Sequence, residues 1–464
     1  MDTKKLRQKI LDLAIRGKLV PQDPNDEPAS VLLERIKEEK ERLIKEGKIK
    51  KSKRMASSDT PHYENVPFEV PDNWVWITLG DIFTLQAGKN ITAKDISEKQ
   101  DKTHCFPCYG GNGLRGYVSS YNREGRFPLI GRQGALCGNI NEANGRFYAT
   151  EHAVAVDTYC DTNIDWAINI LLYLNLNQYA TSTAQPGLSV ATINEVMVPV
   201  PPLKEQQRIS QKLNDWFCLI DQIEQGKEDL QTTIKQTKSR ILDLAIHGKL
   251  VPQDPNDEPA IELLKRINPD FTPCDNGHYA QLPNGWCTTT LKDLCENING
   301  LWKGKKEPFV HVGVIRNANF TKDFKLDYSN IEYIDVEQRT FAKRHLMNGD
   351  LIVEKSGGSD NNPVGRTILY EGESGVFSFS NFTMVLRIKY SNTILSKFLY
   401  YYILAIYQTG AMRLMQTQTT GLHNLILDKF LLMPIYLPPS FEQKRIIDKI
   451  EMVFTTLDMI MESL

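Results

Sequence analysis

Polar side chains in several glycine-flanked loops have the chemistry needed to recognise nucleic-acid bases. Arginine and lysine can pair with guanine O6 and N7, glutamine and asparagine with adenine N6 and N7, and hydroxyl groups can hold phosphates. Any one of these side chains could equally be an ordinary surface residue, so the hypothesis rests on the loops as groups. The candidates are Arg115, Arg132, Gln133, Gln185 and Ser189 in the first half of the chain, and Lys303, Lys305, Arg316, Lys355, Ser356, Arg366, Gln418, Thr419 and His423 in the second half.

The sequence contains no recognisable catalytic motif. It has no Asn/Asp-Pro-Pro-Phe/Tyr motif for holding a target amine, since NNPV at 361–364 does not fit, and no GxxxxGK(S/T) phosphate loop. Gly111, Gly113 and Gly116 spell GxGxxG, but the YVSSY that follows is typical of a strand, which argues against a dinucleotide site. The eight histidines are scattered and form no clear triad. We therefore expect recognition and no catalytic residues.

The cysteines do not predict a metal site. His104, Cys105 and Cys108 form an HCxxC motif, but a zinc ribbon needs a second close pair of ligands. The other cysteines stand apart along the chain, as buried or idle thiols of a reducing compartment do. We expect no metal.

One long helix is expected to organise the elements that carry these loops. Between Pro202 and Ala245, apolar residues recur at alternate spacings of four and three, which is typical of a coiled-coil seam. The two prolines at 201–202 predict its start, and Gly248 predicts its end. The apolar seam positions are Ile209, Leu213, Trp216, Ile220, Ile223, Leu230, Ile234, Ile241 and Leu244, and only Lys227 and Thr237 break the pattern.

A second copy of this helix is divided between the two ends of the chain. The motif PPxxEQxRI at 201–209 recurs at 438–446, an offset of 237 residues. ILDLAIRGKLVPQDPNDEPA at 10–29 recurs at 241–260, an offset of 231 residues, and differs only at Arg16 and His247. The chain is therefore a two-unit repeat that is circularly cut inside one of its helices.

Two globular units of the same plan lie between the helices. VPDNWVWITLGDI at 70–82 matches LPNGWCTTTLKDL at 282–294, so Trp74 and Trp286 are equivalent and are expected to anchor a strand under a core. Residues 146–157 alternate in polarity, which predicts one strand. The remaining matches pair buried helices at 165–180 and 394–410, polar loops at 181–192 and 415–427, IGRQG at 130–134 with VEKSG at 353–357, and PGL at 186–188 with TGL at 420–422.

These patterns predict a mixed α+β fold with a pseudo-twofold internal repeat, in which two α/β domains are joined by long antiparallel coiled-coil helices. The expected globular domains are 66–201 and 268–437. The expected helical segments are 1–65, 202–267 and 438–464, of which the first and the last together complete the second spacer.

The composition is that of an ordinary soluble protein, with 41% hydrophobic and 24% charged residues. A net charge of −2 is unusual for a protein that holds DNA unaided, so partners are expected to supply much of the grip on phosphate. A basic segment at 45–54 is either a solvated helix end or a contact with the DNA backbone. MDTKKLRQ is no signal peptide, and the longest apolar run, Phe398–Tyr407, is too short to cross a membrane, so we expect a cytoplasmic protein.

The paired helix motifs carry a family resemblance that covers nearly the whole chain. A tandem repeat of a variable domain and a helix, opened by PPxxEQxRI and closed by ILDLAxxGKLVPQDPxDEPA, resembles the specificity subunit (HsdS) of type I DNA restriction-modification enzymes. The resemblance implies two target recognition domains, each reading one half of a bipartite, asymmetric sequence in double-stranded DNA. It also implies two modification (HsdM) subunits and attached restriction (HsdR) subunits. S-adenosylmethionine, ATP and Mg belong to those partners, so no cofactor is expected here.

The helices are expected to set the separation of the two domains, about one helical turn of DNA or roughly 34 Å. They are also expected to dock the modification subunits on their exposed faces. The candidates for that contact could equally form intrahelical salt bridges and caps. They are Glu205, Gln206, Arg208, Glu442, Gln443 and Arg445.

Two other classes of protein are alternatives. A stand-alone DNA-binding regulator should bind DNA tightly without partners, which the near-neutral charge disfavours. A scaffold that bridges two proteins would leave the divergence of the two units, beside nearly identical linkers, without a purpose. Asking whether the purified chain is soluble alone and shifts duplex DNA would test both.

Overall fold

The computed structural model of the chain describes residues 2–50, 66–134, 136–181, 186–273, 282–301, 306–359, 362–390, 394–419 and 421–464. It divides into two compact units, Met1–Gly226 and Lys227–Leu464. Three predicted site residues, Gln185, Lys303 and Lys305, lie outside the described residues, as does the basic segment beyond Lys50. The side chains of Gln418 and Thr419 also lie outside the description, although their backbone does not.

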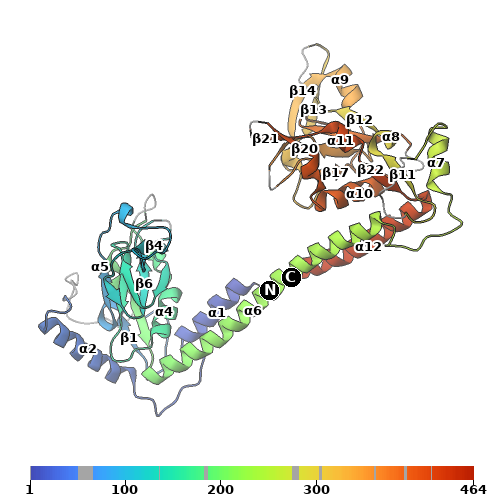
Figure 1. Cartoon of the computed structure of the whole chain (residues 1–464). Coiled ribbons are helices and arrows are strands. Elements are labelled where there is room, and N and C mark those ends of the chain that lie inside the picture. The colour runs from blue at the N-terminus through green and yellow to red at the C-terminus, as the bar shows by residue number, and fades with distance from the viewer. Residues whose placement is uncertain are drawn as a thin grey trace. The chain divides into compact units, whose positions relative to one another are not determined.

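The long helix predicted in the middle of the chain is α6, Leu203–Ile246 (Figure 1). Pro201 and Pro202 precede it directly, and Gly248, just beyond its end, has a φ of +64°. Proline has no N–H to donate and suits a first turn, whereas glycine accepts the left-handed conformation that ends a helix. The predicted start and end of the helix are confirmed.

In the first unit, α6 pairs with a helix from the N-terminal segment. α1, Thr3–Ile15, lies alongside it (Figure 1). The guanidinium of Arg7 lies 3.2 Å from a carboxylate oxygen of Glu224, whereas Gln22, farther along the chain, bonds Glu205 near the start of α6. The contacts therefore run in opposite chain directions, and the pair is antiparallel.

In the second unit, α6 pairs in the same way with α12, Ser440–Ser463 (Figure 1). Lys238 forms an ion pair with Asp458, while Gln253, beyond the end of α6, donates to Glu442 at 3.1 Å. This pair is antiparallel too. The predicted antiparallel helices are thus present within each unit.

The predicted seam of α6 is buried over only part of its length. Trp216, Ile223 and Leu230, which the spacing places on the predicted seam, are 39–40% exposed. Each partner helix covers only one side of α6. Because the helix has 3.6 residues per turn and the 3-4 spacing averages 3.5, successive seam residues drift around the helix and away from the covered side. The buried members are Ile209, Leu213, Ile220, Ile234 and Ile241.

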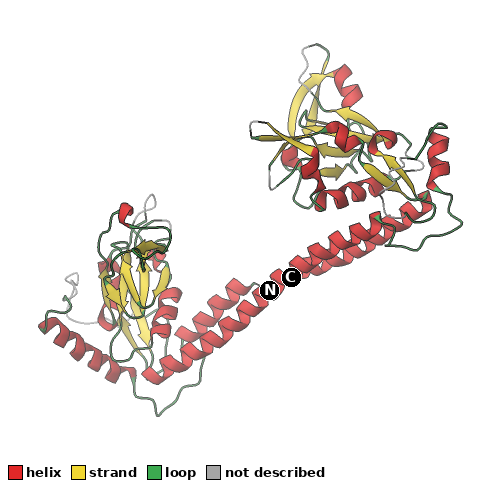
Figure 2. Ribbon diagram, in the orientation of Figure 1, coloured by secondary structure: helices red, strands yellow, loops and turns green. Residues whose placement is uncertain are grey.

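The described residues of the first unit form three small sheets (Figure 2). The first sheet has the order β2 (Thr84–Ala87), β9 (Ala153–Asp157), β6 (Phe127–Gly131) and β7 (Ile140–Ala143). The second has the order β4 (Gly113–Val118), β3 (Phe106–Gly110), β8 (Arg146–Ala149) and β5 (Arg123–Glu124), with β3 parallel to β8. The third pairs β1 (Val75–Thr78) with β10 (Met197–Val200). The unit's other helices are α2 (Ala29–Lys45), α3 (Leu79–Ile82), α4 (Ile164–Tyr173) and α5 (Val190–Asn194).

The second unit repeats this plan. Its sheets have the orders β12 (Cys295–Asn299), β19 (Thr383–Ile388), β15 (Leu351–Glu354), β17 (Thr367–Leu369), and β14 (Glu332–Glu337), β13 (Phe309–Ile315), β18 (Phe377–Phe379), with β13 parallel to β18. β11 (Cys287–Thr290) pairs with β22 (Pro434–Leu437), and a further sheet has the order β16 (Ser356–Gly358), β21 (Leu422–Leu425), β20 (Gln416–Thr419). The other helices are α7 (Ala260–Ile267), α8 (Leu291–Leu294), α9 (Gln338–Arg344), α10 (Ser396–Gln408) and α11 (Leu427–Leu431). The matching strand orders confirm the internal repeat.

Two predictions of local structure are wrong. Residues 146–157 form two strands, β8 and β9, because the turn at Glu151–His152 passes the chain from one sheet to another. Residues 415–427, predicted to be a polar loop, form the hairpin β20–β21 and the start of α11. Polar side chains hid this hairpin, since alternation of polarity shows a strand only where one face is buried.

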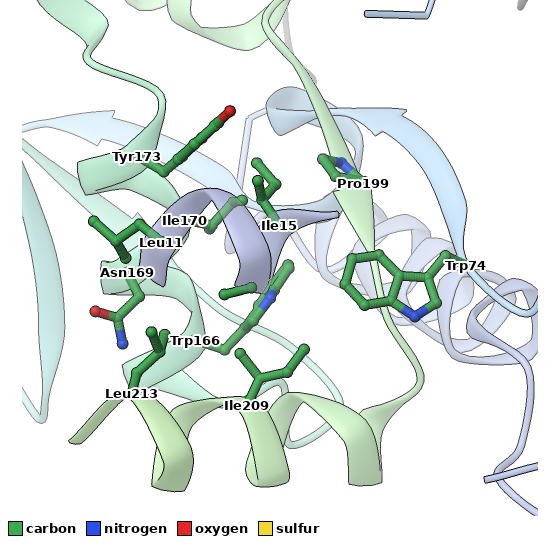
Figure 3. Close-up of a pocket in the computed structure, with 11 residues that line it drawn as sticks. Leu11, Ile15, Trp74, Trp166, Asn169, Ile170, Tyr173, Pro199, Ile209 and Leu213 are labelled. Atoms are coloured by element: carbon green, nitrogen blue, oxygen red, sulfur yellow. The ribbon is translucent and has the colours of Figure 1, made fainter. Parts of the chain in front are cut away.

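Each unit packs its sheets and helices around a core that includes the predicted tryptophan. Trp74 and Trp286 are 5% and 8% exposed, which confirms their structural role. Figure 3 shows side chains of α1, α4 and α6 converging beside Trp74 in the first unit. They leave a cavity of only about 10 Å³. A space of that size holds at most about one water molecule, so this is a packed core and no ligand site.

Candidate nucleic-acid interface

Three segments that are distant in sequence meet in the first unit, and we call their meeting the first platform. They are Arg132–Gln133 after β6, Glu151–His152 before β9, and Gly187–Leu188 before α5. The Arg132 amide donates to the His152 carbonyl at 3.0 Å, and the Leu188 amide donates to the Arg132 carbonyl at 2.9 Å. The structure therefore brings together two of the loops whose polar residues were predicted to act as groups.

The second unit builds the same junction, which we call the second platform. It joins Lys355–Ser356 after β15, Asn381–Phe382 before β19, and Asn424–Leu425 in β21. The Lys355 amide donates to the Phe382 carbonyl at 2.9 Å, and the Leu425 amide donates to the Lys355 carbonyl at 2.8 Å. These bonds confirm the alignment of 130–134 with 353–357. They correct the alignment of PGL with TGL, because the partner of Leu188 is Leu425 and not Leu422.

The first platform exposes cationic and amide groups. Gln133 is exposed, and the Nε atom of Arg132 is buried without a hydrogen-bond partner in the described part of the chain. Arg115 is exposed on β4, just after the β3–β4 turn, and a Cβ atom placed on Gly111 in that turn would lie 3.0 Å from the Gln133 carbonyl oxygen. Three predicted residues, Arg115, Arg132 and Gln133, thus belong to adjoining segments.

Ser189 has a structural task beside this platform. Its hydroxyl accepts a hydrogen bond from the Thr192 amide at 3.0 Å and caps the short helix α5. A serine at this position satisfies a backbone donor that the helix itself leaves free. The hydroxyl predicted to bind DNA is therefore already engaged in a cap.

The second platform presents a different set of side chains. The Lys355 ammonium donates to Asn299 Oδ1 at 3.2 Å, and burial lowers the pKa of this lysine. The Ser356 hydroxyl donates to Asn424 Oδ1 at 2.5 Å, and the side-chain Nδ2 of Asn317 donates to the Ser356 carbonyl at 2.6 Å. Lys355 and Ser356 are thus brought together as predicted, with asparagines that the sequence reading did not single out.

Three predicted residues of the second unit have internal contacts instead. Arg366 Nε lies 3.3 Å from the Glu354 carboxylate, and burial raises the pKa of Glu354. Arg316 forms an ion pair with Glu332. His423, a predicted DNA contact, is only 4% exposed in β21, so its side chain is buried within the unit. The hairpin pairing, hidden at sequence level, is what buries it.

One backbone position lets a neighbouring turn lie close to the first platform. The β6 strand ends at Gly131, and the equivalent residue of the second unit is Glu354. In each case the backbone amide donates to, and the backbone carbonyl accepts from, the segment just before the neighbouring strand of the sheet, β7 or β17. A Cβ atom on Gly131 would lie 2.0 Å from the Gly111 carbonyl oxygen. The glycine therefore lets the β3–β4 turn approach the first platform closely, which no other residue would allow.

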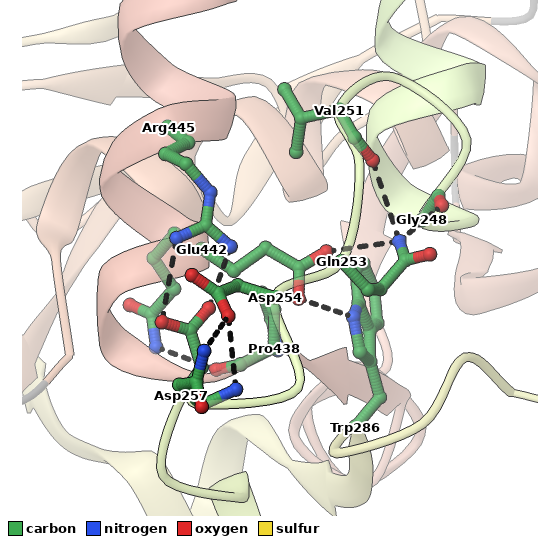
Figure 4. A network of polar contacts seen from close by, with 11 residues as sticks. Gly248, Val251, Gln253, Asp254, Asp257, Trp286, Pro438, Glu442 and Arg445 are labelled. Carbon is green, nitrogen blue, oxygen red and sulfur yellow. Dashed lines mark hydrogen bonds and ion pairs between the residues drawn. The ribbon is translucent and has the colours of Figure 1, made fainter.

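The residues predicted to contact partner subunits lie in another polar cluster, shown for the second unit in Figure 4. Glu442 Oε2 accepts a hydrogen bond from the Trp286 indole at 3.1 Å, and Glu442 Oε1 accepts one from Gln253 at 3.1 Å. Arg445 pairs with Asp257 at 2.6 Å. We call this cluster the second clasp, because it joins the start of α12, the strand-bearing domain that contains Trp286 and the QDPNDEP loop.

The first unit contains the equivalent first clasp. Glu205 Oε2 accepts from the Trp74 indole at 2.9 Å, Glu205 Oε1 accepts from Gln22 at 2.5 Å, and Arg208 pairs with Asp26 at 2.6 Å. Burial raises the pKa of Glu205, as it does that of Glu442. The two repeated motifs are therefore complementary halves of one internal contact.

The prediction that these residues lie on exposed helix faces is wrong for four of them. Glu205, Gln206 and Gln443 are 0% exposed and Glu442 is 1% exposed, because each satisfies donors or acceptors of the neighbouring globular domain. Gln206 Oε1, for example, accepts from the Asn163 amide at 3.1 Å, and Gln443 Oε1 accepts from the Leu395 amide at 3.0 Å. The side chains of Arg208 and Arg445 stay 34% exposed, so a partner contact remains a prediction for them.

A groove of about 500 Å³ opens between α6 and α10 in the second unit. In the first unit the Tyr173 hydroxyl fills the matching place and donates to Asp12 at 3.0 Å. Ala405 is the equivalent of Tyr173, because each lies ten residues after the amide that bonds Gln206 or Gln443, and its small side chain does not reach across this space. Its lining residues are Lys235, Gln236, Ser239, Arg240, Asp243, Ile246, Ala405, Gln408 and Thr409.

The HCxxC motif does not form a metal centre within the described residues. His104 bonds Asp101 at 3.2 Å, and burial raises the pKa of the Cys108 thiol to about 11, which disfavours the thiolate that a metal requires. Across the described ranges there is no group of three or more His, Cys, Asp or Glu residues that could hold a metal ion. The helices in those same ranges include none long and apolar enough to span a membrane.

The sequence reading missed two residues at the centre of the platforms. His152 and Phe382 occupy the same turn before β9 and β19, and their carbonyls hold the Arg132 and Lys355 amides. No motif marks them, because the two turns share no sequence. The signal that could have found them is their place in the chain. Each lies directly before a strand, β9 or β19, and after a strand that pairs in parallel, β8 or β18.

Comparisons with known proteins place these features in a family. The family model described as type I restriction modification DNA specificity domain matches residues 71–232 and 283–463. The chain is 47% identical over 146 residues to the type I restriction enzyme EcoprrI specificity subunit of Escherichia coli, covering 32% of this chain and 36% of that protein. It is 27% identical over 552 aligned positions to the EcoEI specificity subunit of Escherichia coli, covering 98% of this chain and 89% of that protein. The chain thus spans about a third of one of these relatives and most of the other.

A solved structure gives the same result for the fold. A chain from work on complex assembly and conformational transition of the type I R-M system aligns with 86% of this chain and 94% of its own length. The TM-score is 0.58 and the sequence identity is 14%. At that identity the likeness concerns the fold alone.

Proposed function

This chain belongs to the type I restriction-modification DNA specificity family, and on that premise we propose that it selects the DNA sequence on which a type I complex acts. Each recognition unit would read one half of a bipartite, asymmetric target in double-stranded DNA. The bases between the two halves would not be read.

One observation carries this proposal: the two units share a backbone junction but differ in the side chains on it. Arg132 and Gln133 stand in the first platform where Lys355 and Ser356 stand in the second. The clasps, in contrast, use the same residue types in both units. Side chains that vary on a constant frame are what two different half-sites require, since base edges are distinguished by donor and acceptor pattern.

The chemistry of the platforms favours base reading supported by phosphate contacts. Arg132 has a buried Nε without a partner in the described residues, and Gln133 is exposed beside it. An arginine can bind guanine O6 and N7 with two bonds, and a glutamine can bind adenine in the same way. Arg115 and Lys355 would supply further positive charge. Bound phosphate would favour the charged form of Lys355, whose pKa burial lowers.

We propose that catalysis lies on partner subunits and that this chain is not an enzyme. Two modification (HsdM) subunits would transfer the methyl group with S-adenosylmethionine, and restriction (HsdR) subunits would use ATP and Mg. The net charge of −2 supports the need for partners in DNA binding, because a chain without excess positive charge needs them to hold DNA tightly. We place the complex in the cytoplasm.

We propose that the modification subunits dock on exposed apolar side chains of the spacer helices. In the first unit α6 exposes Trp216, Leu219 and Ile223 at 40–49%, and in the second unit α12 exposes Met452 and Met459 at 55% and 66%. Exposed apolar side chains rimmed by polar ones are typical of protein interfaces. Arg208 and Arg445 would lie at the rim of this contact.

Co-expression with a type I modification subunit, followed by mapping of methylated adenines in host DNA, tests the proposal. We expect a split, asymmetric motif that changes in one half when residues 66–200 are exchanged for those of another family member. If no sequence is methylated and the purified chain alone binds duplex DNA tightly, the chain is a stand-alone regulator.

A further inference from the structure

An exposed phenyl ring lies at the centre of the second platform. Phe382 is 47% exposed, although its backbone is tightly held: its carbonyl accepts from the Lys355 amide at 2.9 Å and from the Ser356 amide at 3.1 Å. A ring on a fixed backbone, beside a lysine and a serine, can be presented to a ligand without loss of chain entropy.

The first unit places a histidine at this position. The His152 carbonyl accepts from the Arg132 amide at 3.0 Å, and the His152 side chain is 37% exposed, with Nε2 lying 3.2 Å from Glu151 Oε1. The same backbone position thus carries a hydrogen-bonding ring in one unit and a purely apolar ring in the other. A position that differs in chemistry but not in geometry is suited to distinguish ligands.

We propose that this position determines base specificity in both units, and that Phe382 recognises the 5-methyl group of a thymine while His152 recognises a hydrogen-bonding base edge. The inference rests on the proposed function and deepens it. Among base edges in the major groove, the thymine methyl is the apolar one, and phenylalanine is a side chain that contacts it. Lys355 and Ser356, held by the same carbonyl, would bond the neighbouring bases or phosphates.

Duplexes in which single thymines are replaced by deoxyuridine test the inference, because uracil lacks only the methyl group. The measurement uses the complete complex with its modification subunits. Its relative affinity for thymine-containing and uracil-containing duplexes of its own target is measured by competition. Burial of one methyl group predicts a preference of about fourfold for thymine at one position of the half-site read by the second unit. Phe382→Ala should reduce this preference to about one, and Phe382→Leu should keep part of it.

Phe441→Ala provides the matched control. Phe441 is another phenylalanine of the second unit and is 70% exposed on α12, outside the platform. Its loss should leave the preference for thymine unchanged, even if it weakens the assembly of the complex.

The outcomes separate this inference from the proposed function. A complex that binds a split target, but has no thymine in that half-site or shows no uracil effect, refutes the role of Phe382 and leaves the proposed function intact. Retention of the thymine preference in Phe382→Ala refutes it as well. A complex that binds no specific sequence refutes the proposed function and, with it, the inference.

Discussion

Removing the hydrogen bond between Trp74 and Glu205 should show how strongly a clasp joins the spacer helix to its globular domain. The perturbation is a double-mutant cycle of Trp74→Phe, Glu205→Ala and the double variant. The bond is 2.9 Å long, and the two residues are 5% and 0% exposed. Each single change leaves a buried polar partner without its bond, whereas the double change removes both partners.

The magnitude follows from the burial of this bond. A hydrogen bond to a charged group contributes roughly 1.5–3 kcal/mol, so we expect a coupling energy of that size between the two changes. The second clasp offers a replicate within the same chain, since the Trp286 indole donates to Glu442 at 3.1 Å. Its cycle should give the same coupling within about 1 kcal/mol.

Amide hydrogen exchange is the suitable assay, because two units need not unfold together and one global free energy of unfolding would then be undefined. Opening free energies are compared between peptides of the first and second units. Variants of the first clasp should lower the opening free energy of peptides from the first unit. Variants of the second clasp should lower that of peptides from the second unit. The mixed pair Glu205→Ala with Trp286→Phe belongs to different clasps and should be additive within about 0.5 kcal/mol.

A coupling energy below about 0.5 kcal/mol in both clasps would refute this reasoning. The motif pair would then be retained for some task other than holding the unit to its helix.

Three further predictions concern single residues. Arg132→Ala should relax or abolish recognition in one half-site only, measured by mapping methylated sequences; equal losses in both halves would count against the assignment. Gly131→Ala should destabilise the first unit by about 1–3 kcal/mol in hydrogen exchange, because the added Cβ atom would lie 2.0 Å from the Gly111 carbonyl oxygen. Gly187→Ala is the control: its Cβ atom would have nothing within 4 Å, so it should change the stability by less than about 0.5 kcal/mol. Equal stabilities of the two variants would contradict the close approach at Gly131. Burial raises the pKa of Glu354, so the folded unit binds the carboxyl proton of Glu354 more tightly than the unfolded chain does. The stability that Glu354 contributes therefore falls as the pH rises from the ordinary pKa of 4.5 through the higher pKa of the folded unit. Glu354→Gln should remove that fall in urea titrations of the second unit; an unchanged pH profile would argue against it.

Local and periodic features of this protein were predictable from the sequence. The 3-4 spacing and flanking prolines predicted α6, because a helix depends on residues near one another in the chain. The matched motifs predicted the internal repeat, because a repeat is visible as sequence identity at a fixed offset without knowledge of the contacts. The equivalence of Trp74 and Trp286 was also correct, since a tryptophan in a repeated strand motif is usually a core anchor. The predicted alignment of Arg132 with Lys355 was also correct, since the two residues make equivalent backbone hydrogen bonds.

Features that depend on how distant segments meet were decided only by the tertiary structure. The sequence shows Glu205 as a charged residue of an amphipathic helix, but the Trp74 indole and the Gln22 amide bury it, and both come from elsewhere in the chain. His152 and Phe382 enter the platforms because a turn between two sheets places them there. Sequence patterns therefore determined which segments are helices, repeats and cores, whereas the order in which strands pair decided which polar groups face each other and which remain for a ligand.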